Sequence, residues 1–359
     1  MTRAILSALL LLGSVAHAQT TPPQIPYTAD AEFLKLPDTM FLGEVSGIAV
    51  NAAGHVFVFN RGNTRGPAYA AAAAQLLEFG PDGAFIREVG PNLYAWSFAH
   101  DVKVDRDGNI WAADKGSDQV IRFNPAGRVT MVFGRKQEAA DEDTKPLEHP
   151  KPPKPPIDGY FRQVTDITWD SKGNGYISDG YINSRVAKVS PTGEWLGSFG
   201  TPGDGPGQLN TPHSIATDAQ DRIYVADRGN RRVQVFDTDG NVLRQITIDV
   251  PFDPATKPAL GNRPDQNPPV GTPKTMVAGA PWTVCITPPP NQVLYASDGY
   301  PGRIYKLSLD GKVLGYLGKS GKMPGEFGWI HQIACPSENT LFVAELLNWR
   351  VQKLELKPQ

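Results

Sequence analysis

The sequence has few cysteines and little clustered charge. It contains two cysteines in 359 residues, enough for one disulfide at most. Its charge is nearly balanced, with 35 basic and 37 acidic side chains, and it has no basic cluster beyond one Lys-Pro-rich loop. We therefore expect neither nucleic acid nor an anionic membrane as a partner. A small-molecule or peptide substrate fits this charge better, and we expect a monomer.

Long apolar segments are also scarce. The one such run, in "MTRAILSALLLLGSVAHAQ", covers about 12 residues, whereas a membrane helix needs roughly 20. Arg3 precedes the run and Ala16-His17-Ala18 follows it, a pattern typical of a secretory signal peptide. We therefore expect a signal peptide over residues 1–18 and a single domain over residues 19–359. No cysteine directly follows the expected cleavage site, so we expect a secreted or periplasmic protein without a lipid anchor.

Helical periodicity is lacking as well, because 36 glycines and 33 prolines interrupt the chain. What is present is a unit that recurs six times: an alternating apolar stretch, a Gly or Asn turn, and a second apolar stretch. Alternation with such turns predicts antiparallel hairpins. Units of roughly 50 residues built from short strands indicate blades. The predicted fold is therefore all-β, a six-bladed β-propeller.

The two ends and two long insertions complete this prediction. The last unit ends without an outer strand, and "DAEFLKL" (residues 30–36) has strand character, so the N-terminal strand is expected to complete the last blade. The insertions at residues 135–159 and 251–276 are rich in proline. They are expected to be irregular loops on one face of the propeller, as spacers or as a lid.

Histidines recur at one position of the repeat. Alignment of the inner strands gives one register position, occupied in blade order by Ser46, His100, Thr165, His213, Trp282 and His331. Side chains from alternate blades would meet at the propeller axis, and three convergent imidazoles form a typical zinc site with an open fourth position. Each histidine alone could equally be an ordinary strand residue. The shared register favours the metal site.

The same register predicts the state of the cysteines. Cys285 lies three residues after Trp282, and Cys335 lies four after His331. Side chains alternate between the faces of a strand, so the two are expected on opposite faces as free, buried thiols.

The sequence resembles the peptidyl-α-hydroxyglycine α-amidating lyase family, a zinc-dependent propeller with NHL-like repeats. The resemblance rests on "ISDGYINSRVAKVSPTG", "GQLNTPHSIATD", "IYVADRGNRRVQVF", "HDVKVDRDGNIWAAD" and "VFNRGN". It implies that His100, His213 and His331 bind zinc. It also implies a structural calcium, with Val102 and Gln332 at the matching positions.

The resemblance assigns further site residues. Tyr181, in "SDGY", matches the catalytic tyrosine, and Arg61 and Arg228 match arginines that face the substrate and the metal-bound oxygen. Trp329, where the family has methionine, and Tyr300, in a second "SDGY", are the other expected substrate contacts. Tyr181 could instead simply pack beside the channel.

The expected activity is cleavage of a carbinolamide C–N bond to an amide and glyoxylate. Arg228 could instead pair with an Asp of a blade turn, and Gln332 replaces an acidic residue of the family. One alternative function is a non-enzymatic NHL-repeat propeller that binds a peptide, glycan or protein. Another is a hydrolase with calcium in the channel, which would need a centre rich in carboxylates.

Overall fold

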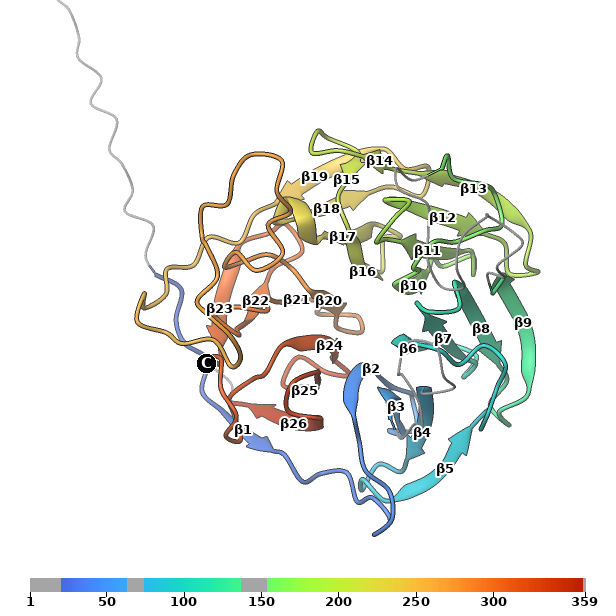
Figure 1. The fold of residues 1–359 in the computed structure, drawn as a ribbon, viewed down its shortest axis with the longest axis horizontal. Coiled ribbons are helices and arrows are strands. Elements are labelled where there is room, and N and C mark those ends of the chain that lie inside the picture. Colours follow the sequence, from blue (N-terminus) through green and yellow to red (C-terminus); the bar gives the residue numbers. More distant parts are fainter. Residues whose placement is uncertain (1–20, 63–73, 137–153, 358–359) are drawn as a thin grey trace, which may run out of the picture.

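The chain forms six four-stranded antiparallel sheets arranged around a common centre (Figure 1). The computed structural model describes residues 21–62, 74–136 and 154–357. Each sheet is one blade, and its first strand in the chain lies nearest the centre, except that the last blade takes its outer strand from the N-terminus. The predicted six-bladed β-propeller is confirmed. The proposed signal peptide lies outside the described residues.

The strands follow one order in every blade, from the centre outwards. Blades one and two contain β2 (Glu44–Val50), β3 (Val56–Arg61), β4 (Ala74–Phe79), β5 (Phe85–Val89), β6 (Ala99–Val104), β7 (Ile110–Asp114), β8 (Gln119–Phe123) and β9 (Val129–Gly134). Blades three and four contain β10 (Asp166–Trp169), β11 (Gly175–Asp179), β12 (Arg185–Val189), β13 (Trp195–Phe199), β16 (Pro212–Thr217), β17 (Ile223–Asp227), β18 (Arg232–Phe236) and β19 (Val242–Ile246). Blades five and six contain β20 (Thr283–Ile286), β21 (Leu294–Ser297), β22 (Ile304–Leu307), β23 (Val313–Leu317), β24 (Ile330–Ala334), β25 (Thr340–Glu345), β26 (Arg350–Leu356) and β1 (Tyr27–Asp30). A short parallel pair, β14 (Thr201–Pro202) with β15 (Gln208–Leu209), and one 3-10 turn, η1 (Arg228–Asn230), complete the described elements.

The acidic residue that ends most second strands anchors the loop before its own blade. The buried Asp114 carboxylate accepts the backbone amides of Ser97 and Phe98, and Asp227 accepts that of Asn210. In blade six, Glu345 accepts the amide of Gly328 in the same way. Hydrogen bonds to carboxylates are stronger than neutral ones. These side chains therefore hold the loops on the face where the second strands end.

The N-terminal strand completes blade six, as predicted, but its predicted bounds were wrong. Strand β1 pairs with β26 over Tyr27–Asp30, and residues 31–36 form turns and an isolated bridge instead. The apolar side chains that suggested a strand have another role. Phe33 packs edge-on against Phe342 at the blade boundary, in a hydrophobic cluster that also includes Leu34 and Leu36.

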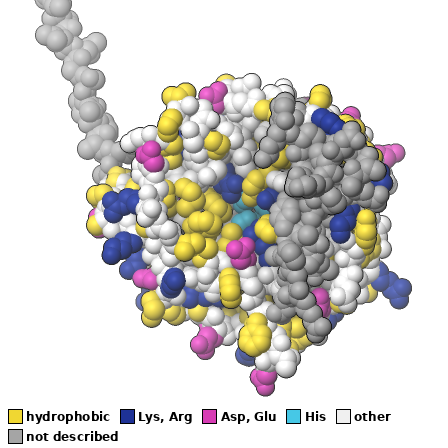
Figure 2. Space-filling view, viewed as in Figure 1, with side chains coloured by type: hydrophobic (Ala, Val, Ile, Leu, Met, Phe, Trp, Pro, Cys, Tyr) yellow, Lys and Arg dark blue, Asp and Glu magenta, His cyan; other side chains and the backbone are white. Residues whose placement is uncertain are grey.

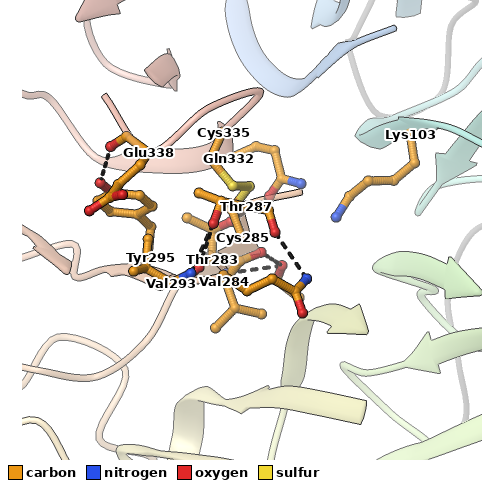
Figure 3. The surroundings of a disulfide bond; sticks show 12 residues. Lys103, Thr283, Val284, Cys285, Thr287, Val293, Tyr295, Gln332, Cys335 and Glu338 are labelled. Atoms are coloured by element: carbon orange, nitrogen blue, oxygen red, sulfur yellow. Dashed lines mark hydrogen bonds between the residues drawn. A yellow bond between two sulfur atoms is a disulfide. The ribbon is translucent and has the colours of Figure 1, made fainter. Parts of the chain in front are cut away.

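The prediction of two free thiols was also wrong. Cys285 and Cys335 form a disulfide that joins blades five and six (Figure 3), with their Cα atoms 6.1 Å apart. The ladder between β24 and β25 gains one residue between Ile330 and Gln332, whereas β20 pairs with β21 without a shift. This extra residue reverses the alternation after His331. Cys335, four residues after His331, can therefore face Cys285, three residues after Trp282.

The second insertion is irregular, as predicted, because residues 251–276 contain no strand or helix. Much of the first insertion, residues 137–153, lies outside the described residues. In the described part of the chain, no helix has the length and apolar character of a membrane span.

Candidate metal centre

Three histidine side chains from alternate blades meet at the centre of the propeller. His100 on β6, His213 on β16 and His331 on β24 offer ligand nitrogens that all lie within 4.8 Å of one another. The ring centroids are 4.6 to 4.8 Å apart. The three imidazoles are therefore close enough to bind one metal ion.

A β-bulge in the inner strand lies at each of these histidines. The ladder to the second strand shifts by one residue between Ala99 and Asp101 in blade two, and at the equivalent place in blades four and six. Blade one has the same shift around Ser46. A bulge leaves its extra residue unpaired and changes the direction of the side chain. The bulges thus allow the histidines to leave the regular alternation and point to the axis.

Each imidazole is oriented by a backbone carbonyl of the next blade. The Nδ1–H groups donate to the carbonyl oxygens at the neighbouring register positions: His100 to Thr165 (2.7 Å), His213 to Trp282 (2.6 Å) and His331 to Ser46 (2.6 Å). A proton on Nδ1 leaves the lone pair on Nε2. The odd blades therefore supply acceptors where the even blades supply imidazoles, and all three Nε2 atoms are available as ligands.

The electrostatic environment keeps the three imidazoles neutral. Burial lowers their pKa values well below the usual range, and each pKa is lowered further by positive charge from one or more of Arg61, Lys115 and Arg228. The histidine side chains are 1 to 3% exposed. Neutral imidazoles with hydrogen-bonded Nδ1 atoms are the usual form of metal-ligating histidine. The donor set fits a divalent transition metal, with zinc among those that imidazole binds well.

Tyr181 lies beside this centre. Its hydroxyl is 3.0 Å from Nε2 of His213 and 3.4 Å from Nε2 of His100. The preceding Gly180 permits this position, because a Cβ atom there would lie 2.1 Å from the carbonyl oxygen of Pro212. The glycine of "SDGY" thus lets blade three approach blade four closely enough for the phenol to reach the imidazoles.

Three basic side chains surround the phenol, and the sequence analysis identified only two of them. The Arg228 guanidinium carbon is 5.4 Å from the centroid of the Tyr181 ring, and the Lys115 ammonium is 4.1 Å from it. Lys115 was missed, although it follows its register histidine by fifteen residues, as Arg228 does, and Arg61 has the same offset from Ser46. Burial alone would raise the pKa of Tyr181, but Arg228, Lys115 and Arg61 lower it below its ordinary value.

The two predicted arginines differ in how they are held. Arg61 donates to the Glu44 carboxylate at 2.6 Å and to the carbonyl of Ala99 at 3.0 Å. Arg228 stacks on Trp282 at 4.5 Å, and the Asp227 carboxylate beside it pairs with Arg232 instead. Within the described residues, the buried Nε atom of Arg228 has no hydrogen-bond partner. A buried unpaired donor is costly, so an acceptor supplied by a ligand would stabilise this side chain.

The remaining predicted contacts occupy different places. Trp329 is half-buried, and its ring is 5.7 Å from that of Trp282. Its indole nitrogen also has no partner in the part of the chain that the structure describes. Tyr300 is fully buried, and its hydroxyl donates to the carbonyl of Thr256 in the second insertion. Trp329 therefore borders the centre through Trp282, whereas the polar atom of Tyr300 holds the insertion.

The centre opens on one face of the propeller. Figure 2 shows histidine at the bottom of a hollow near the middle of this face, beside basic and hydrophobic side chains. A small substrate can therefore approach the imidazoles from this side.

A second ring of side chains lies one residue further along the inner strands. Its members are Gly47, Asp101, Asp166, Ser214, Thr283 and Gln332. They contact one another across blade boundaries: Ser214 donates to Asp166, and Thr283 donates to Gln332. The register position itself has no carboxylate, and the sequence analysis did not anticipate the two in this next ring.

Comparisons with known proteins test the family resemblance. Residues 209–236 match the model of the NHL repeat. The chain contains an NHL repeat. It is 29% identical over 220 residues to the peptidylglycine alpha-amidating monooxygenase of Rattus norvegicus, a match that covers 55% of this chain and 21% of that protein. The resemblance to the amidating lyases is confirmed at this modest identity.

Two further curated relatives cover more of their own length. A probable peptidyl-alpha-hydroxyglycine alpha-amidating lyase of Caenorhabditis elegans is 25% identical over 60% of this chain and 62% of its own. The NHL repeat-containing protein 3 of Mus musculus is 30% identical over 55% of this chain and 53% of its own. The matched region thus spans from about a fifth to three fifths of these relatives.

A solved structure supports the fold alone. The virginiamycin B lyase of Staphylococcus aureus superimposes with a TM-score of 0.55 at 14% identity, covering 92% of this chain and all of the other.

Proposed function

We propose that the protein is a zinc-dependent lyase that cleaves the C–N bond of an α-hydroxyglycine-type carbinolamide, giving an amide and glyoxylate. The observation that carries the proposal is the position of the Tyr181 hydroxyl, 3.0 Å from the ligand nitrogen of His213, within a ring of three imidazoles. The lyase named among the relatives supports the reaction class. A purely binding propeller would not need this arrangement.

The substrate carries a terminal carboxylate beside the carbinol carbon, and the basic residues provide its binding site. Among the described residues the buried Nε atom of Arg228 has no partner, and both Arg228 and the Lys115 ammonium lie close to the Tyr181 ring. Arginine binds carboxylates through two parallel hydrogen bonds. Arg61 is held by Glu44 and adds positive charge from the opposite blade. Trp282 and Trp329 line the site with apolar surface for the rest of the peptide.

The reaction moves one proton and breaks one bond. Tyr181 in its phenolate form takes the proton of the substrate hydroxyl, a C=O bond forms, and the C–N electron pair leaves with the amide nitrogen. Tyr181 then returns the proton to that nitrogen, so the atoms balance without water or a redox partner. His100, His213 and His331 would hold the zinc ion, which acts as a Lewis acid and stabilises negative charge on the substrate oxygen.

The location proposed for this activity is outside the cytoplasm. The disulfide between Cys285 and Cys335 supports it, because such bonds persist in oxidising compartments. The N-terminal signal pattern points the same way.

The direct test measures metal content and turnover together. Purified protein is assayed by mass spectrometry for bound metals, and glyoxylate release is followed with a panel of α-hydroxyglycine-extended peptides. We expect one zinc per chain and metal-dependent release of glyoxylate. The absence of metal after purification in zinc-containing buffer would refute the proposal and favour the binding propeller.

A further inference from the structure

A lysine side chain supplies a positive charge beside the second ring of the channel. The Lys103 ammonium lies 3.3 Å from a carboxylate oxygen of Asp166 and 3.4 Å from the carbonyl oxygen of Ile215. The Asp166 side chain is fully buried, and a fifth of the Lys103 side chain is exposed. Figure 3 shows Lys103 extending from its strand toward Thr283 and Gln332. The ammonium of blade two thus contacts residues of blades three and four.

The oxygens of Asp166 are already engaged. One oxygen accepts the Ser214 hydroxyl and the Ile215 amide, both at 2.8 Å, in addition to Lys103. The other accepts the amide of Ile167 at 2.7 Å. The first of these oxygens, with three donors, has no lone pair left for a metal ion.

Gln332 and Gly47, two other members of the ring, add little to a cation site. Calcium takes six to eight oxygen ligands, and its affinity increases with the number of charged ligands. Gln332 is neutral, and its amide oxygen already accepts the Thr283 hydroxyl at 2.6 Å. The Gly47 position has no side chain to contribute, because a Cβ there would lie 2.7 Å from the Val102 nitrogen. A divalent ion in the ring would also lie close to the Lys103 ammonium, at a large electrostatic cost.

The charge of Lys103 is stabilised by its surroundings. Its ammonium lies 3.3 Å from the buried Asp166 carboxylate and 3.4 Å from the carbonyl oxygen of Ile215, and both oxygens favour a positive charge at this place.

We propose that the Lys103 ammonium takes the structural place that the family resemblance assigns to calcium, so that this propeller neutralises the acidic centre of its channel without a second metal ion. The residues at this level do not fit a calcium ion, because one Asp166 oxygen already has three donors and a fixed positive charge is present. This proposal does not depend on the reaction proposed above.

The first test uses the wild-type protein. It is equilibrated with calcium chloride, passed through a desalting column into calcium-free buffer, and analysed for calcium and zinc by mass spectrometry. Melting temperatures are measured with and without added calcium chloride. We expect no stoichiometric calcium and an unchanged melting temperature. One retained calcium per chain, or a melting temperature raised by calcium, would overturn the proposal whether or not the protein is a lyase.

The second test removes the charge. Lys103→Met leaves the buried Asp166 carboxylate without its cation, and we expect the melting temperature to fall by several degrees. Lys306→Met is the matched control: its side chain is 17% exposed and pairs with Glu338, which is 44% exposed. We expect little change there, because the Glu338 carboxylate remains solvated.

A double variant keeps this test decisive if Lys103→Met fails to fold. In Lys103→Met/Asp166→Asn the unpaired carboxylate is absent, so we expect most of the lost stability to return. A wild-type melting temperature in the single variant, or no recovery in the double variant, would show that Lys103 does not neutralise Asp166.

Discussion

Tyr181→Phe separates chemistry from metal binding, because it removes only a hydroxyl group. That hydroxyl lies 3.0 Å from Nε2 of His213, while the Nδ1–H of this imidazole donates to the carbonyl of Trp282. The orientation of the ligand therefore does not depend on Tyr181. We expect the variant to fold, to keep its zinc, and to lose the base that takes the substrate proton.

The size of the loss follows from the neighbours of the phenol. A positioned general base typically contributes about 10²- to 10⁴-fold, which equals about 3–5 kcal/mol in the barrier. Arg61, Lys115 and Arg228 are the charged side chains that act on the phenol, and the guanidinium groups cannot accept a proton. The imidazole Nε2 atoms would bind the metal. We therefore expect kcat to fall by a factor near the upper end, about 10⁴.

The assay is glyoxylate release as a function of pH, with zinc content measured on the same samples. The phenolate is the active form, so the wild-type rate should rise with pH up to the pKa of Tyr181, which the basic neighbours hold below the usual value of about 10. This rise should be absent in Tyr181→Phe. Tyr224→Phe is the control, because its buried hydroxyl bonds to Asp218 and Leu309 in the body of a blade. A Tyr181→Phe enzyme with wild-type kcat and an unchanged pH profile would refute the assignment.

Three further changes test other parts of the site and the fold. His213→Ala should weaken zinc binding by at least about 100-fold, measured by competition with a chelator, because even loss of a supporting hydrogen bond to a ligand costs 10- to 100-fold; full retention of zinc would contradict the three-histidine site. Lys115→Met should raise KM about tenfold for a carboxylate substrate, since a charge-assisted hydrogen bond contributes about 1.5–3 kcal/mol, but should not change KM for its methyl ester; equal effects on both would mean that Lys115 does not bind the carboxylate. Replacing Cys285 and Cys335 by alanine together should lower the free energy of unfolding by about 4 kcal/mol, from the loop entropy of a 50-residue separation; titration of two free thiols in the unreduced wild-type protein would exclude the disulfide.

Much of the candidate site could be predicted because equivalent positions can be counted in each repeat unit. Three histidines at one register position of alternate units can meet only near the axis of a six-bladed propeller, and they do. The same count could have identified Lys115, which has the same offset from its register position as Arg61 and Arg228.

Other features could not be predicted by counting residues along the sequence. The pairing of the cysteines, for example, depends on a one-residue shift between strands. The bulge at His331 reverses the side-chain alternation after it, so counting from this histidine placed Cys335 on the wrong face. The bounds of the N-terminal strand were wrong because apolar residues also pack outside strands. Phe33 has the apolar character of a strand residue, but it packs against Phe342 outside any ladder.

The amino-acid sequence by itself determined the number of blades, the closure of the last blade by the N-terminus, and which blades carry imidazoles. All three follow from local alternation and repetition. Only the folded molecule decided how the imidazoles are aimed, which cysteines meet, and that Lys103 lies against Asp166 in the channel. These contacts join residues of different blades, and their geometry is set by bulges and by carbonyl groups of the neighbouring blade. Such groups are present in every residue and therefore leave no trace in the sequence.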